Sequence, residues 1–474
     1  DNIKIDNLGG ETEYVGGFRL HGTTVYGFGK EDNDARIIIR DEGANKMFRA
    51  EAPLFVLRKG EQLSAERAMV VIYLEADSIF HPSVNLKFNI PAKEMRLYRG
   101  KRGSDRNPFF SSYHQVNMDV DNIDWKMNRD SLVFGKRSVS FANSKEMTFE
   151  SLKYFKQDDF RRIQNISSTN PISILKLFSE EEGTNMVSAS RLAKRLNPRY
   201  DVTSIQSLLY DLVAKGFINY NSDKEIVEVK DKVFHYVNAS AKQVDHDVLK
   251  ILSKTDSTNA VMLLSDRSIE TNAVTFIEFS EVQKVAVKPF KEKIIMKKNR
   301  DINFDGRTFA GFSTFEGKDF AFVYDKNHIE MDSVRFFDLF VLSDEELDDE
   351  GNPVPLSIGS RVEHSTGVLL IDAPSNKSSK EDIPIFPSYQ SKGPSYVYYD
   401  YEQTLNGIYR RDSFFFKLDK FSFNSLDAYT AEDIHFKGMM HSFDIFPPFK
   451  ETLLLREEDE SLGFINTTPE EGYP

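Results

Sequence analysis

The feature that most constrains this chain is an alternation of apolar residues at period two, interrupted once by a helical period. From about residue 259 to 341, apolar residues recur at every second position and turn residues return every eight to twelve. Between residues 171 and 218 the apolar spacing becomes helical. Period-two alternation places one face of a strand on a core. The sequence therefore predicts a mainly β chain that carries one compact helical block.

Short strands are expected on both sides of the helical block. Each candidate is bounded by Gly, Pro, Asp or Asn, as strand ends require. In the first region the candidates are 35–40, 52–58, 69–74, 84–88 and 94–99. In the last region Phe320, Phe322 and Tyr324 are expected to share one face of a strand. The predicted domains are a β-rich region over 1–165, an inserted module over 166–240 and a second β-rich region over 241–474.

Two mainly β arrangements are compatible with this spacing. Regular short strands suit an extended β-solenoid of the β-helix kind, and they also suit β-sandwiches. We favour the solenoid because the hairpin dipeptides Asn-Gly and Asp-Gly do not recur between the strands, Asp305-Gly306 being the one clear case. The repeat is too irregular to write as a consensus.

The helical block has the element order of a winged-helix module. A first helix is expected after Asn170-Pro171, and Ser188 is expected to cap a second over 189–196. Thr203 or Ser204 should cap a third helix that stops at Gly216, and two short strands follow over 217–220 and 225–229. We expect a winged-helix-like module inserted in the β framework.

The balance of charge weighs against a nucleic-acid partner. The chain carries 61 Lys and Arg against 74 Asp and Glu, a net charge of -13, which would repel phosphates. Asp201 and Asp211 also flank the third helix, which would read DNA in a winged-helix regulator. We therefore expect the module to dock proteins, with Tyr210, Lys215 and Tyr220 as its partner-binding residues.

Catalytic motifs are lacking in the sequence. It has no cysteine, which excludes disulfides and a cysteine nucleophile and is compatible with an oxidising compartment. It also has no Gly-x-Ser-x-Gly elbow and no phosphate-binding glycine loop. We assign no catalytic residue and expect a non-enzymatic protein.

A calcium site is a weaker hypothesis, and calcium is the one cofactor considered. The loop over 343–352 is strongly acidic, and Asp344, Asp348 and Glu350 are its candidate ligands. The loop has enough carboxylates for calcium but no recognisable calcium-loop geometry. A solvated acidic surface is the favoured interpretation.

Sugar chemistry forms an alternative function. Tyr396, Tyr398, Tyr399 and Tyr401 could stack on sugar rings, and a pair of carboxylates could meet in the fold. The favoured interpretation is that these tyrosines pack within a strand. The alternative to a scaffold is thus a polysaccharide-binding or polysaccharide-cleaving β-helix protein, with a winged-helix DNA-binding regulator ranked last.

Five segments of the sequence resemble a known group of proteins. They are GGFRLHGTTVYGFG, DSIFHPSVNLKFN, SSYHQVNMDVDNIDW, KKNRDINFDGRTFAGF and DESLGFI. They resemble parts of very large, uncharacterised β-rich envelope proteins of Gram-negative bacteria. The resemblance implies a location in the periplasm or at the cell surface and a longer parent polypeptide, which the start at Asp1 without methionine also led us to expect. The resulting hypothesis is a structural scaffold or assembly component that binds other envelope proteins, outer-membrane components among them.

Overall fold

A computed structural model describes most of the chain. The described residues are 3–6, 8, 12–30, 33–100, 103–135, 145–164, 169–347, 349, 351, 353–402, 405–443, 445–456 and 460–465, without the side chains of 145, 343–346 and 405. The protein is mainly β, as predicted, with 50% of residues in strands and 16% in helices. Its strands form a large antiparallel sheet.

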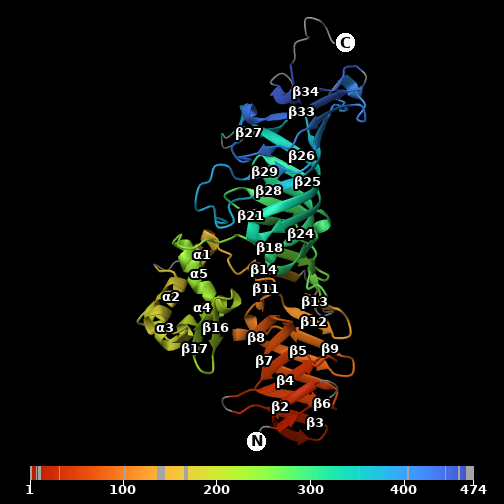
Figure 1. The fold of residues 1–474 in the computed structure, drawn as a ribbon. Coiled ribbons are helices and arrows are strands. Elements are labelled where there is room, and N and C mark those ends of the chain that lie inside the picture. Colours follow the sequence, from red (N-terminus) through yellow and green to blue (C-terminus); the bar gives the residue numbers. More distant parts are fainter. Residues whose placement is uncertain are drawn as a thin grey trace. The chain divides into compact units, whose positions relative to one another are not determined.

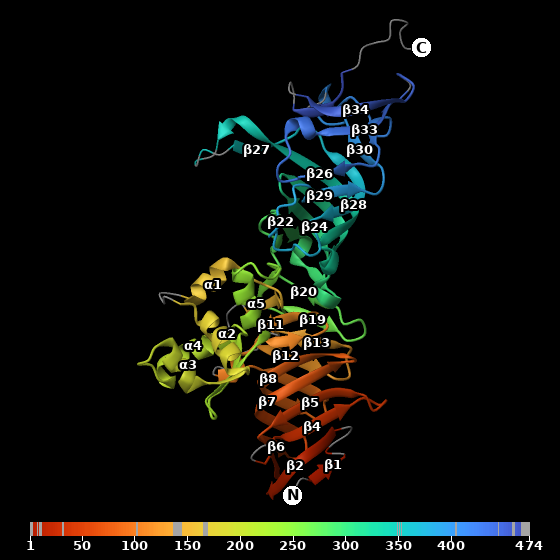
Figure 2. The ribbon, with the colours of Figure 1, turned by 60° about the vertical axis from the view of Figure 1, so that its left-hand side comes forward.

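The chain divides into two compact units. Unit 1 consists of Asp1–Val274 with Ile295–Arg300, and unit 2 consists of Thr275–Ile294 with Asp301–Pro474. Figures 1 and 2 show the strands of each unit and the cluster of helices that belongs to unit 1. The units are described separately below.

Unit 1 contains the first twenty strands, of which β15, β16 and β17 belong to its helical module and seventeen lie outside it. They are β1 (Ile3–Ile5), β2 (Thr12–His21), β3 (Thr24–Phe28), β4 (Ala35–Arg40), β5 (Lys46–Ala52), β6 (Leu54–Arg58), β7 (Gln62–Leu74), β8 (Asp77–Asn89), β9 (Glu94–Tyr98), β10 (Phe109–Ser111), β11 (Val116–Asp119), β12 (Asn122–Lys126), β13 (Ser131–Phe134), β14 (Lys145–Ser151), β18 (Lys250–Thr255), β19 (Ala260–Leu263) and β20 (Ile269–Thr271). The 3₁₀ helices η1 (Gly103–Arg106) and η3 (Lys298–Arg300) also belong to it.

The long strands of unit 1 each take part in two ladders. Residues 62–65 of β7 pair with β6, whereas residues 69–72 pair with β5. The strand is bulged between these halves, where Arg67 has a φ of 54°. Before the bulge the buried residues have odd numbers, such as Leu63 and Ala65, and after it they have even numbers, such as Ala68 and Val70. The bulge thus shifts the alternation by one residue. β8 changes phase in the same way near Pro82, from buried Ile79 to buried Val84.

The helical module of unit 1 has its own core. Its elements are α1 (Gln157–Gln164), α2 (Pro171–Glu182), β15 (Met186–Ser188), α3 (Ala189–Leu196), α4 (Val202–Ala214), β16 (Ile218–Asn221), β17 (Ile226–Val229) and α5 (Asp231–Ser240). β15, β17 and β16 form a separate three-stranded antiparallel sheet. Leu175, Leu209, Leu212 and Val227 are buried together in the module, and Tyr236 of α5 closes the cluster.

The ends of the module helices have definite caps. Asn170 accepts a hydrogen bond from the Ile172 amide and Pro171 stands in the first turn of α2, as predicted. Ser188 caps α3, also as predicted. The cap of α4 is Asp201 rather than Thr203 or Ser204, because Asp201 and Ser204 form a reciprocal capping box.

Unit 2 consists of antiparallel strands around an aromatic core. Its strands are β21 (Ile277–Ser280), β22 (Val285–Pro289), β24 (Ile302–Ala310), β25 (Ser313–Val323), β26 (His328–Leu347), β27 (Pro353–Ser357), β28 (Val362–Leu370), β29 (Ser388–Ser391), β30 (Ser395–Tyr398), β31 (Phe414–Leu418), β32 (Ser422–Phe423), β33 (His435–Ser442), β34 (Phe449–Arg456) and β35 (Ser461–Gly463). The strand β23 (Ile294–Met296) crosses the boundary between the units in the sequence, because Ile294 belongs to unit 2 and the residues after it to unit 1. Short 3₁₀ helices are η2 (Phe290–Glu292), η4 (Tyr324–Lys326), η5 (Leu405–Gly407) and η6 (Ala431–Asp433).

Aromatic stacking fills the core of unit 2. The rings of Phe315 and Phe337 stack at 4.5 Å, and Tyr389 lies 4.8 Å from Phe315. Phe320 and Phe322 are buried on one face of β25, as their alternation predicted. Buried aromatic rings in such contacts contribute a large part of the apolar core of unit 2.

A polar loop of unit 2 is tied to one buried carboxylate. Asp372 accepts hydrogen bonds from Gln283, Asn376 and Ser379 at 2.7–2.9 Å. The loop that follows Asp372 is therefore ordered by hydrogen bonds rather than by apolar packing.

None of the helices in the described part of the chain has the length and apolarity needed to cross a membrane.

Candidate functional site

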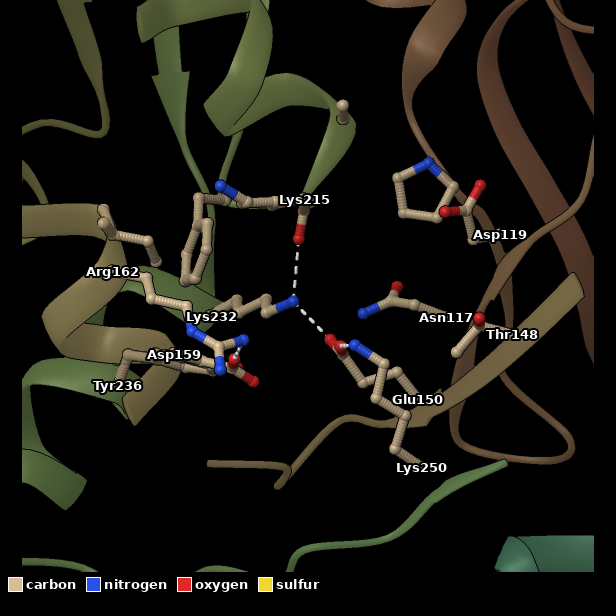
Figure 3. Close-up of a pocket in the computed structure, with 14 residues that line it drawn as sticks. Asn117, Asp119, Thr148, Glu150, Asp159, Arg162, Lys215, Lys232, Tyr236 and Lys250 are labelled. Carbon is tan, nitrogen blue, oxygen red and sulfur yellow. Dashed lines mark hydrogen bonds and ion pairs between the residues drawn. The ribbon is translucent and has the colours of Figure 1, made fainter. Parts of the chain in front are cut away.

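The helical module meets the strands of unit 1 around a small cavity, which we call the seam cavity (Figure 3). Its volume is about 240 Å³. The strand side contributes Asn117 and Asp119 of β11, Thr148 and Glu150 of β14 and Lys250 of β18. The module contributes Asp159, Arg162, Ile163, Ala214, Lys215, Phe217, Lys232 and Tyr236.

Glu150 is the central charge of the seam cavity. Its side chain is 15% exposed, and it accepts hydrogen bonds from Lys232 of α5 and from Lys250 Nζ, the latter at 3.2 Å. Burial alone would raise the pKa of Glu150, but the two lysines outweigh burial and hold the pKa below its ordinary value. The carboxylate is therefore ionised and fully engaged at neutral pH.

Lys232 is held from several sides. Its Nζ donates a hydrogen bond of 2.7 Å to the carbonyl oxygen of Lys215, and it lies 4.7 Å from the ring centre of Phe217 and 5.4 Å from that of Tyr236. Its side chain is only 11% exposed. Cation–π contacts of this kind are stronger when the ammonium is desolvated. Lys232 thus joins the module to β14 as a buried, fixed charge.

Further contacts along the same seam are polar. Lys230 Nζ donates a hydrogen bond to Asn107 Oδ1 at 2.7 Å, and Ser104 Oγ donates one to the Tyr220 carbonyl at 2.5 Å. The Asn107 carbonyl in turn lies 2.7 Å from Nε2 of the buried His81. Burial lowers the pKa of Lys230 to about 8 and that of His81 to about 3. The module is consequently joined to the strands by a series of directional bonds.

Other charged side chains of the seam cavity bond to residues outside its lining. Asp159 accepts a hydrogen bond from the Tyr154 hydroxyl at 2.8 Å, and Lys215 pairs with Asp211 at 2.5 Å. Small-molecule pockets usually measure roughly 300–1,000 Å³, so the cavity is also small for a substrate. Its chemistry is that of a structural junction.

One serine and histidine pair of unit 1 has the geometry of a nucleophile and base. Ser111 Oγ lies 2.8 Å from His114 Nδ1, and His114 Nε2 lies 2.8 Å from the Arg267 carbonyl. Both side chains are completely buried, and burial lowers the pKa of His114 to about 4. A substrate cannot reach a pair at zero exposure, so this pair stabilises the core.

A second, larger hollow lies between the wing of the module and the first strands of unit 1. We call it the wing groove, and its volume is about 1420 Å³. The module side includes Met186, Tyr210, Asn219, Tyr220, Asp223, Lys224, Ile226 and Glu228. The strand side includes Lys30, Asp34, Arg36, Glu51, Pro53, Arg67, Pro82, Ser83 and Asp105. An ion pair of 3.1 Å between Arg67 and Asp223 links the two sides.

The predicted partner-binding residues occupy different places. Tyr210 and Tyr220 both line the wing groove, with ring centres 6.3 Å apart. Tyr220 is only 4% exposed, whereas Lys215 belongs to the seam cavity and is 45% exposed in its side chain. The structure brings Tyr210 and Tyr220 together and separates Lys215 from them. Their role in binding a partner stays a prediction.

The predicted calcium ligands lie in a loop of which the structure describes only a part. Asp348 and Glu350 lie outside the described residues, and the side chain of Asp344 does too. Within the described residues, no group of three or more His, Cys, Asp or Glu side chains is placed to hold a metal ion. Asp119 and Asp121, also acidic and close in sequence, pair with Arg99 at 2.5 and 3.3 Å.

The tyrosines considered for sugar binding are half-buried among other side chains. The Tyr396 and Tyr398 rings stack at 6.0 Å, and the Arg411 guanidinium lies 4.1 Å from the ring centre of Tyr398. Arg411 also forms hydrogen bonds of 2.7 and 3.0 Å with the buried Glu363, to which Tyr401 donates another at 2.8 Å. These rings are thus engaged in packing and in a charge network.

Apart from Lys215, sequence reasoning did not find the residues of the seam. Glu150, Lys230 and Lys232 were not identified because their partners are far away in the chain. The helical spacing of Val233, Tyr236 and Val237 in α5 was a signal that could have located this helix.

Comparisons with family models, with curated proteins and with solved structures found no match.

Proposed function

We propose that the protein is a non-enzymatic scaffold of the bacterial cell envelope that binds a segment of another protein in the wing groove. The observation that carries this proposal is the groove itself, about 1420 Å³ in volume and lined by both the module and the strands. That volume exceeds the roughly 300–1,000 Å³ of pockets that enclose small molecules. A polypeptide segment is the occupant whose size fits.

The lining of the wing groove also suits a polypeptide. Met186 is 53% exposed, and the partly exposed Tyr210 and Ile226 add apolar surface beside it. Both signs of charge surround these residues, as at Arg67 and Asp223. Protein interfaces combine an aromatic and aliphatic centre with a polar rim in this way.

For the finer architecture we propose a winged-helix-like module on layered β ladders. The order α2, α3, α4, β16, β17 supports the winged-helix interpretation. Antiparallel registers along the long strands support layers over stacked parallel coils. The envelope location has its support in the resemblance of five sequence segments to envelope proteins.

A DNA-binding role is not favoured by the surroundings of α4. Beside α4, the module is bonded to the 3₁₀ helix η1, because Ser104 donates a hydrogen bond to the Tyr220 carbonyl of β16. On its exposed side, Gln206 bonds to Tyr210 and the Lys215 charge is paired with Asp211. We expect no salt-dependent retention on duplex DNA.

Site-specific photo-crosslinking tests the proposal. A photoreactive phenylalanine replaces Asn219 in the groove or, as the matched control, Leu177 on α2, which is 49% exposed. In envelope fractions the groove position should give a discrete protein adduct that excess unmodified chain suppresses. Adducts that are absent at Asn219, or identical at both positions, contradict the proposal.

A further inference from the structure

Arg36 stands on the strand side of the wing groove, in the middle of three neighbouring strands of unit 1 (Figure 1). It lies on β4 between Val15 of β2 and Glu51 of β5, its partners in the two ladders, and all three residues line the groove. Ala35 and Ile37, on either side of Arg36 in the chain, are completely buried. Because alternate residues of a strand share a face, Arg36 points away from the core and toward the groove.

The guanidinium of Arg36 has no charge partner. In the part of the chain that the structure describes it forms no ion pair or hydrogen bond, and its Nε is buried without a partner. The carboxylate of Glu51 is already engaged, because Arg49 Nε donates a hydrogen bond to it at 3.0 Å. Arg40, further along β4, is paired with Glu13 at 3.6 Å. A cation withdrawn from water without a partner is unfavourable, so Arg36 favours the approach of an anion.

The acidic residues of the groove are better provided for. Three of them form an ion pair or accept a hydrogen bond within the lining, namely Asp105 from Ser83, Asp223 with Arg67 and Glu228 from Asn219. Burial raises the pKa of Asp34, whereas the nearby charges of Arg67 and Lys224 act in the opposite direction. Asp34 therefore has two cations close to it.

The other cations of the groove differ from Arg36 in their exposure. Lys30, Arg67 and Lys224 are exposed to water, and among the lining cations that the structure describes Arg36 alone is partly buried. Water solvates an exposed ammonium or guanidinium without a counter-charge, whereas a partly buried one depends more on a partner. The groove thus offers one cation that gains from a ligand carboxylate.

We infer that Arg36 selects the segment that binds in the wing groove by pairing with an acidic side chain of that segment. The inference rests on the proposed function and names the chemistry of the occupant. A carboxylate can accept two parallel hydrogen bonds from a guanidinium, and the surrounding protein strengthens the pair by excluding water. The apolar residues of the segment contact Met186, Tyr210 and Ile226 on the module side. A basic segment would leave Arg36 unpaired beside a like charge.

Peptide selection on the full chain tests the inference. A displayed library of random peptides is selected against the wild-type chain, Arg36→Glu and Arg40→Glu. Arg40 is the matched control, because it lies on the same strand, is paired with Glu13 and does not line the groove. A peptide counts only if it forms an adduct with a photoreactive phenylalanine in place of Asn219. The wild type and Arg40→Glu should enrich acidic peptides, whereas Arg36→Glu should enrich peptides with Lys or Arg instead.

A mutant cycle then measures the pairing. An enriched peptide and its variant with the acidic residue changed to the amide are titrated by fluorescence anisotropy. Arg36→Gln should weaken binding of the acidic peptide at least about tenfold and that of the amide peptide less than about twofold. Arg36→Lys should restore only part of the loss, since an ammonium cannot replace the planar fork. Circular dichroism checks that each variant is folded.

The outcomes distinguish this inference from the proposed function. Peptides that attach in the groove without an acidic residue, or that bind Arg36→Gln as tightly as the wild type, overturn the inference and leave the proposed function standing. Basic peptides enriched by the wild type overturn it as well and assign recognition to Asp34. If only envelope fractions give an adduct at Asn219, an unchanged yield in Arg36→Gln overturns it. Absence of every adduct at Asn219 contradicts both.

Discussion

Lys232 of α5 and Glu150 of β14 form a buried ion pair across 82 residues of sequence. The pair joins the helical module to the strands of unit 1, and Lys250 completes it from β18. Since this seam joins the module side of the wing groove to the strand side, the binding role proposed for the groove depends on the pair.

Glu150→Gln should destabilise unit 1 by about 2–3 kcal/mol, because it leaves two lysines without their buried carboxylate. Urea denaturation measures the change. The matched control is Glu146→Gln on the same strand, whose pair with Lys254 is 58% exposed on both sides and should matter by less than about 0.5 kcal/mol. Equal effects of the two variants would contradict the account.

Stability should fall as the pH decreases from about 6.5 to about 5, because of buried histidines. Burial lowers the pKa of His81 from 6.5 to about 3 and that of His114 to about 4, so the unfolded chain binds more protons in this range. Each histidine should contribute a loss of about 1 kcal/mol per pH unit. His81→Asn and His114→Asn should each flatten the dependence, measured by denaturation at several pH values; an unchanged slope would refute the assignment.

Lys230 should produce a pH dependence of the same sign at alkaline pH. Its pKa is lowered by burial to about 8 in the folded protein, against 10.5 when exposed. The unfolded chain therefore binds more protons between these values, and stability should rise with pH there relative to Lys230→Met. Parallel curves for the two proteins between pH 8 and 9.5 would show that Lys230 is not desolvated.

In unit 2, Arg411→Lys should cost about 1–2 kcal/mol and Arg411→Ala about 3 kcal/mol. The reason is that Glu363 is only 3% exposed and a lysine cannot replace the two parallel hydrogen bonds of the guanidinium. Arg410→Lys is the control, since Arg410 is 79% exposed in its pair with Asp412. Thermal unfolding of the full chain reads out the change, and a control as damaging as Arg411→Ala would count against the network.

Strands with unbroken apolar alternation were predicted at nearly their full length. Where the alternation is interrupted, the predicted strands were shorter than the observed ones. The strand over 35–40 matches β4, and the strand over 94–99 matches β9 within one residue. Only 69–74 of β7 was predicted, because the bulge at Arg67 shifts the buried phase by one residue. Similarly, Pro82 concealed the first half of β8. Because a bulge interrupts the apolar alternation, it is mistaken for the end of a strand when the sequence alone is considered.

The contacts that position the module could not be predicted from local patterns. Helix caps such as Asn170 and Ser188 depend on residues within a few positions and were recognised. Glu150 and Lys232 appear in the sequence as ordinary surface charges, since nothing nearby indicates that each will be buried by the other. The seam is a property of the fold rather than of any motif.

A double-mutant cycle on Glu150→Gln and Lys232→Met tests the central claim, that the module is a fixed part of unit 1 held by this pair. Four proteins are compared by urea denaturation, with the photo-crosslinking yield at Asn219 as a second readout. The account predicts a coupling free energy of about 1–3 kcal/mol and a lower crosslinking yield in both single variants. Additive effects within about 0.3 kcal/mol, with an unchanged yield, would contradict it.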